Sequence, residues 1–189
     1  MKCFKNATVY VEGEGLKKTT VCFDEKIEKI SRCAIKDADV LELPEDAIIV
    51  PGFIDQHIHG AGGSDGMDGT VEDIAIIAKT VAAEGTTSFL VTTMTQSPEN
   101  ITKAMQAVKS YKEADSKEGA RVLGVHLEGP FIAAAHKGAQ PLEYVAKPDV
   151  ELFDKLNNVF MDYNSKISSV DVLAGCPMLI QVNVYGTKV

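Results

Sequence analysis

The sequence predicts an α/β fold of parallel strands, preceded by a small β unit. Short β-rich segments fill residues 1–50, an apolar run follows at 47–54, and strand, loop and helix patterns then recur. The expected strands begin near residues 48, 87 and 121. Their spacing, roughly 35 to 40 residues, suits βαβ units, whose strands are parallel and joined by right-handed crossovers.

The first 50 residues predict strands separated by turns, with the clearest turn signal at Glu12-Gly13-Glu14-Gly15. Because the following run, 47–54, has no charged residue, we expect a strand buried on both faces. The β-rich segments of the first part are 7–12, 19–24, 26–31 and 39–43.

Helical and strand patterns alternate in the rest of the chain. Apolar spacing predicts a helix over 71–83 ended by Gly85, and Pro98 opens another that extends to about residue 113. An open doubly wound sheet and a (β/α)8 barrel both fit this order. The remaining expected elements are strands at 87–93, 121–127, 166–174 and 179–184, and a helix that begins at 149.

The composition argues against nucleic acid and membranes as partners. The net charge of -8 and the lack of a Lys/Arg cluster argue against nucleic acid. The polar amino terminus and the short apolar runs predict neither a signal peptide nor a membrane partner. The cysteines form no CxxC pair, so we expect four reduced thiols in a cytoplasmic protein: Cys3, Cys22, Cys33 and Cys176.

Two histidines, His57 and His59, follow the first apolar strand of the core. Alternate residues of a strand share a face, about 7 Å apart at about 3.3 Å per residue. Two imidazoles at that spacing can converge on one zinc or iron ion. A bare HxH is more often a pair in a surface loop, but a place at the carboxyl end of a parallel strand favours metal ligands.

Glu128 lies at the carboxyl end of the third strand, where it is open to three roles. It binds metal, pairs with a base or caps the next helix. His126 shares its face, and either supports the ligands from behind or is a buried core residue. The glycine-rich loop at 60–66 matches no phosphate-binding pattern, and we interpret it as a flexible loop near a site.

These segments resemble a known family. VPGFIDQHIHG at 50–60 is similar to the first barrel strand of the amidohydrolase superfamily, and GTTS at 85–88 to its second. HLEGPF at 126–131, followed by HKGAQP at 136–141, is more specific and resembles the N-acetylglucosamine-6-phosphate deacetylases. The resemblance extends to about residue 157.

The resemblance implies a partial (β/α)8 TIM-type barrel, with the first three to four βα units present, beside a small β-sandwich. The implied parts are a β-sandwich part at 1–50, barrel units at 51–157 and a divergent tail at 158–189. The general-base aspartate is expected beyond this chain. A homo-oligomer is also implied.

The resemblance also implies residue roles. Glu128 becomes a ligand of a divalent metal, zinc or iron, and His57 and His59 belong to a second metal position. His126 supports them. Ala139 and Gln140 contact the sugar, although members often have histidine where Gln140 stands.

The implied reaction belongs to amino-sugar catabolism. It hydrolyses the acetamide of N-acetylglucosamine 6-phosphate to glucosamine 6-phosphate and acetate, and we expect it to be impaired in this short chain. Two alternatives remain open. One is a non-catalytic fragment that binds metal or sugar phosphate, and the other is a different cyclic amidohydrolase such as a dihydroorotase-like enzyme.

Overall fold

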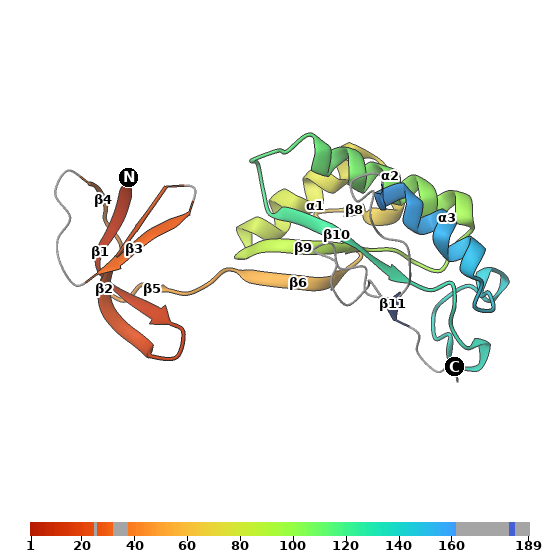
Figure 1. Cartoon of the computed structure of the whole chain (residues 1–189), viewed down its shortest axis with the longest axis horizontal. Coiled ribbons are helices and arrows are strands. Elements are labelled where there is room, and N and C mark those ends of the chain that lie inside the picture. Colours follow the sequence, from red (N-terminus) through yellow and green to blue (C-terminus); the bar gives the residue numbers. More distant parts are fainter. Residues whose placement is uncertain (25, 32–37, 162–181, 184–189) are drawn as a thin grey trace. The chain divides into compact units, whose positions relative to one another are not determined.

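A computed structural model of the chain describes residues 1–24, 26–31, 38–161 and 182–183. It divides the chain into two compact units, Met1–Pro51 and Gly52–Val189 (Figure 1). Over the described residues, no helix has both the length and the apolar character needed to cross a bilayer.

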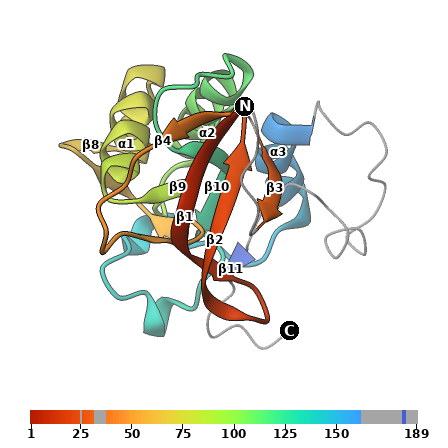
Figure 2. The same cartoon turned by 90° about the vertical axis from the view of Figure 1, so that its left-hand side faces the viewer.

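The first unit is one five-stranded sheet. Its centre is an antiparallel hairpin of β1 (Lys2–Val11) and β2 (Gly15–Phe23). The strand β3 (Ile27–Ser31) pairs with β2, whereas β4 (Asp39–Leu41) and β5 (Ile48–Ile49) pair in parallel with β1. Figure 2 shows β4, β1, β2 and β3 side by side in that order. Strands are confirmed in all four segments predicted for this part of the chain.

A disulfide joins Cys3 and Cys22, which lie opposite each other on β1 and β2. Both side chains are buried. The prediction of four reduced thiols is therefore wrong for this pair, because strand pairing brings together residues that are distant in sequence. Cys33 and Cys176 lie outside the described residues.

The second unit contains a parallel sheet in the order β11-β10-β9-β6. Its strands are β6 (Phe53–Ile58), β9 (Thr86–Thr92), β10 (Arg121–Glu128) and β11 (Val182–Asn183). The predicted strand at 179–184 is confirmed at Val182–Asn183, the part of it that is described, whereas the one predicted at 166–174 lies outside the described residues.

Three helices cover one face of this sheet (Figure 1). They are α1 (Val71–Ala83), α2 (Pro98–Glu113) and α3 (Val150–Met161), so the helices predicted from sequence are confirmed. The core lies between sheet and helices. Its largest fully buried members include Ile74, Ile77, Phe89, Val91, Ile101, Met105, Val108, Val125, Leu127 and Leu156.

Short elements shape the loops of the second unit. The glycine-rich segment forms a hairpin of β7 (Gly60–Ala61) and β8 (Ser64–Asp65). It is followed by one turn of 3-10 helix, Gly66–Asp68. Two more 3-10 turns, Ala134–His136 and Leu142–Tyr144, lie between β10 and α3.

The apolar run at 47–54 is not the single buried strand that the sequence predicts. It is divided between the units: β5 ends at Ile49, and β6 begins at Phe53. Pro51 lies in the gap and has no backbone N–H to contribute to a ladder. Phe53 and Ile54 are 66% and 62% exposed, because β6 is the edge strand of its sheet in the described part of the chain.

Thr70 fixes the start of α1. Its Oγ1 accepts a hydrogen bond from the backbone N of Asp73 at 3.1 Å. The Asp73 carboxylate in turn accepts hydrogen bonds from the hydroxyls of Thr70 and Ser64. These bonds, first the one from Thr70, hold the pKa of Asp73 below its usual value.

Loss of this cap is expected to destabilise the second unit. In Thr70→Ala the first turn of α1 loses its side-chain acceptor, so the free energy of unfolding falls by about 1 kcal/mol. Urea denaturation followed by far-UV circular dichroism measures the change. Thr70→Ser keeps the hydroxyl and should retain most of the stability; an equal loss in both variants would contradict the capping role.

Candidate metal centre

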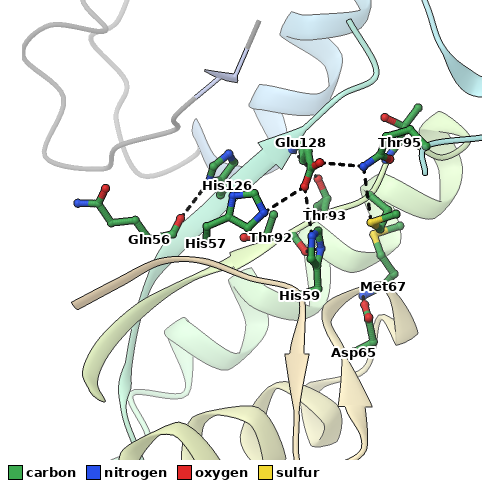
Figure 3. Close-up of polar contacts among 12 residues, drawn as sticks. Gln56, His57, His59, Asp65, Met67, Thr92, Thr93, Thr95, His126 and Glu128 are labelled. Atoms are coloured by element: carbon green, nitrogen blue, oxygen red, sulfur yellow. Dashed lines mark hydrogen bonds and ion pairs between the residues drawn. The ribbon is translucent and has the colours of Figure 1, made fainter. Parts of the chain in front are cut away.

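The carboxyl ends of three parallel strands meet at one edge of the second unit's sheet. His57 lies in β6, His59 directly follows it, and Glu128 is the last residue of β10. The strand between them, β9, ends at Thr92. Figure 3 shows the side chains of His57, His59 and Glu128 pointing toward one another. The structure thus brings together the three residues predicted as metal ligands.

One carboxylate oxygen lies at the centre of the cluster. Glu128 Oε2 is 3.2 Å from Nε2 of His57 and 3.2 Å from Nε2 of His59. One donor atom from each residue falls within 4.8 Å of the others. Two ligands of a tetrahedral zinc ion, each about 2.0 to 2.1 Å from the metal, lie roughly 3.3 to 3.4 Å apart. The two separations from Glu128 Oε2 therefore fit a cation of that size.

The contacts at this oxygen are not hydrogen bonds. Glu128 Oε2 is buried and has no hydrogen-bond partner among the described residues, although both imidazole nitrogens are within ion-pair distance. A buried carboxylate oxygen without a donor is unfavourable by about 1 to 3 kcal/mol or more. The three side chains aim at a common point without a hydrogen bond between them, an arrangement that suits a metal ion.

The two histidine rings are held by different neighbours. His59 Nδ1 lies 3.2 Å from the carbonyl O of Thr92, which can only accept a hydrogen bond. A hydrogen bond to this acceptor uses the proton of Nδ1, so Nε2 is the ring nitrogen that faces Glu128. The His57 ring packs edge-on against His59 and His126, with centroid separations of 5.2 and 4.6 Å.

The ring of His126 packs against the ring of His57. Its Nδ1 is 2.9 Å from the carbonyl O of Gln56, and its side chain is almost fully buried. Its Nε2 is buried without a hydrogen-bond partner in the described part of the chain. This position agrees with the supporting role expected from sequence, which stays a prediction.

Of the two residues expected to contact a sugar, only Gln140 contacts the cluster. Its Nε2 donates to Glu128 Oε1 at 2.8 Å, and its side chain is buried. Ala139 is exposed in the same loop. The loop after β6 is tied to the site as well, since the backbone N of Gly66 donates to the carbonyl O of His59 at 2.7 Å.

The contribution of β9 and the residues after it was not predicted from the sequence. Thr93 Oγ1 accepts a hydrogen bond from the Glu128 backbone N at 3.3 Å, and the Thr95 backbone N donates to Gln140 Oε1 at 2.8 Å. Together with the Thr92 carbonyl, these groups contact the residues of the cluster from the end of the middle strand. The signal was the polar run 92–97 at the carboxyl end of a predicted parallel strand.

The donor set and its place define the class of protein. Two imidazoles and a carboxylate suit zinc or iron, and they lie at the carboxyl edge of a parallel sheet, where α/β enzymes place their sites. The chain is thus an α/β protein with a candidate centre for a divalent metal.

Comparison with known proteins agrees with this class. Residues 48–172 match the Amidohydrolase family, and the chain belongs to that family. The resemblance found in the sequence is confirmed.

The most similar relatives include N-acetylglucosamine-6-phosphate deacetylases. The one from Bacillus subtilis is 40% identical over 156 residues, which are 80% of this chain and 39% of the relative. The one from Lysinibacillus sphaericus is 46% identical over 107 residues, covering 57% of this chain and 27% of the relative. The crystal structure of the Pasteurella multocida deacetylase superposes with a TM-score of 0.74 at 28% identity, over 84% of this chain and 42% of the other. This chain therefore spans well under half the length of these relatives.

Gly129 lets the chain turn directly after Glu128. Its φ is +74°, in the left-handed region, and a Cβ there would overlap the Thr95 side chain. Gly138 has a similar φ of +59° but open space around it. Substituting each glycine therefore separates backbone strain, expected at both positions, from steric overlap, expected at Gly129.

Gly129→Ala is expected to lower the free energy of unfolding by about 3 kcal/mol, from left-handed strain and overpacking together. Gly138→Ala carries the strain alone and should lose about 1 kcal/mol. Urea denaturation of both variants measures the difference. Equal losses would mean that the contact with Thr95 is not tight.

Proposed function

We propose that this chain carries the metal centre of an N-acetylglucosamine-6-phosphate deacetylase, which hydrolyses the acetamide to release acetate and glucosamine 6-phosphate. The observation that carries the proposal is the convergence of His57, His59 and Glu128 at the carboxyl ends of β6 and β10. Identity of 40% to the Bacillus subtilis deacetylase over 156 residues supports the choice of substrate.

In this proposal the three clustered side chains hold a divalent cation, zinc or iron. When bound, such a cation polarises the amide carbonyl and makes water more acidic. His59 presents Nε2 because its Nδ1 contacts the Thr92 carbonyl, and His126 restrains the ring of His57. The general-base carboxylate is assigned to a part of the enzyme outside this chain.

We also propose that the second unit is part of a (β/α)8 barrel, containing its first three to four βα units. The three helices lie on one face of the parallel sheet (Figure 1), as barrel helices do, whereas a doubly wound sheet has helices on both faces. The parts proposed are a β-sandwich part at 1–50, barrel units at 51–157 and a divergent tail at 158–189. A homo-oligomer is proposed on the resemblance alone.

A second candidate function is a non-catalytic fragment that binds metal or sugar phosphate. The observation that favours it is the geometry itself, since His57, His59 and Glu128 come together among the described residues. Metal binding without acetate release would support this reading.

A cytoplasmic location is proposed from the cysteine pattern, which has no CxxC pair and was expected to give reduced thiols. The disulfide between Cys3 and Cys22 opposes it, since such bonds are typical of oxidising compartments. Thiol titration of protein isolated from cytoplasm under alkylating conditions decides between the two.

Metal binding is the first test of the proposal. We expect the chain to bind zinc with one-to-one stoichiometry in a competition titration against a chromophoric chelator. His57→Ala and Glu128→Gln each remove a ligand, so the affinity should fall by at least about a hundredfold. His136→Ala, which removes an exposed histidine, is the matched control and should bind as the wild type does. Unchanged affinity in Glu128→Gln would refute the proposed centre.

Activity is tested in a chimera, because the chain spans only part of its relatives. Residues 1–157 replace the matching segment of the Bacillus subtilis deacetylase, and acetate release from N-acetylglucosamine 6-phosphate is measured with added zinc or iron. Glu128→Gln should lower kcat/KM about a thousandfold or more, since several kcal/mol of transition-state stabilisation are lost. Exposed Glu143→Gln is the control. A folded, metal-loaded chimera that releases no acetate would contradict the substrate proposed.

A further inference from the structure

Both ends of the Gln140 side-chain amide have hydrogen-bond partners in the candidate centre. Although polar, its side chain is only 6% exposed. Its Oε1 accepts a hydrogen bond from the Thr95 backbone N at 2.8 Å, and its Nε2 donates to Glu128 Oε1 at 2.8 Å. Nε2 also lies 3.8 Å from the sulfur of Met94. The amide thus has partners at both ends.

The neighbours fix which end of the amide faces Glu128. A backbone N–H can only donate, so the group that faces Thr95 must be the amide oxygen. The NH2 group is then turned toward Glu128, whose carboxylate accepts. The orientation follows from the chemistry of the two partners, which removes the usual ambiguity between oxygen and nitrogen in a glutamine side chain.

This link determines which carboxylate oxygen is free. The terminal torsion of a glutamate has a broad preference, so an isolated carboxylate can rotate. With Oε1 held by Gln140 and the Glu128 backbone N held by Thr93 Oγ1, Oε2 is the oxygen left facing His57 and His59. Gln140 lies 12 residues after Glu128 and 45 after Thr95, so one side chain joins two strand ends.

We propose that Gln140 is a positioning residue for the metal centre, which holds the Glu128 carboxylate with Oε2 directed at the cation. The inference rests on the proposed function, because it concerns the same site. This role is separate from the contact with sugar that the family resemblance implied for Gln140, which stays a prediction.

The test is zinc affinity in Gln140→Met, which is close to glutamine in length and lacks both hydrogen-bonding groups. Loss of a residue that orients a ligand lowers metal affinity about 10- to 100-fold, and we expect a loss of that size. Gln106→Met, at an exposed position on α2, is the matched control and should bind zinc normally. Titrations are run at a temperature where circular dichroism shows every metal-free variant to be folded.

A second measurement separates positioning from simple stabilisation. Cobalt(II) in place of zinc reports ligand geometry through its visible absorption bands. Those bands should shift in Gln140→Met and stay unchanged in Gln106→Met. A purely structural role would lower the melting temperature of the metal-free variant, but leave the affinity and the cobalt spectrum of the folded protein unaltered, and that result would overturn the inference.

Gln140→Asn is the variant to measure if Gln140→Met does not fold. Asparagine keeps the amide but is one methylene shorter, so it cannot reach Thr95 and Glu128 together. It should lose zinc affinity as the methionine variant does, and wild-type affinity in a folded Gln140→Asn would overturn the inference while the metal centre stands. Absence of zinc binding by the wild-type chain would instead remove the proposed function, and the inference with it.

Discussion

Glu128 is the residue on which the candidate centre depends. Its backbone N donates a hydrogen bond to Thr93, directly after β9, and its Oε1 accepts one from Gln140 in the loop after β10. Its Oε2 faces both histidines. The first two contacts are hydrogen bonds, and the third is not. A buried carboxylate oxygen without a partner is unfavourable in a medium of low dielectric constant. A cation at that point would bind this oxygen and the Nε2 atoms of both histidines at once.

Parallel strands make this convergence possible. Crossover helices carry the chain back across one face of the sheet, so the ends of β6, β9 and β10 meet at one edge (Figure 1). The same geometry leaves β6 with a neighbour on one side only in the described residues, and Phe53 and Ile54 exposed. An edge of this kind is normally paired or covered.

Local patterns were sufficient to predict local elements. Apolar spacing and a terminal glycine give α1 its observed bounds. Alternation along a strand finds His57 and His59, and a place at the carboxyl end of a strand finds Glu128. Features that depend on contacts between distant segments were not predictable. The pairing of Cys3 with Cys22 follows from the register of a hairpin, and the link from Gln140 to Thr95 follows from the path of a loop. Neither leaves a periodic signal in the sequence.

An irregularity in β6 explains how the histidines gain their support. The register between β6 and β9 shifts between Asp55 and Ile58, so the strand carries an extra residue where Gln56 and His57 lie. The Gln56 carbonyl lies 2.9 Å from His126 Nδ1, on the strand beyond β9. A bulge re-aims side chains and releases backbone groups from the ladder. The departure from regular pairing thus lets one strand provide His57 as a candidate ligand and, from its backbone, an acceptor for the histidine packed behind it.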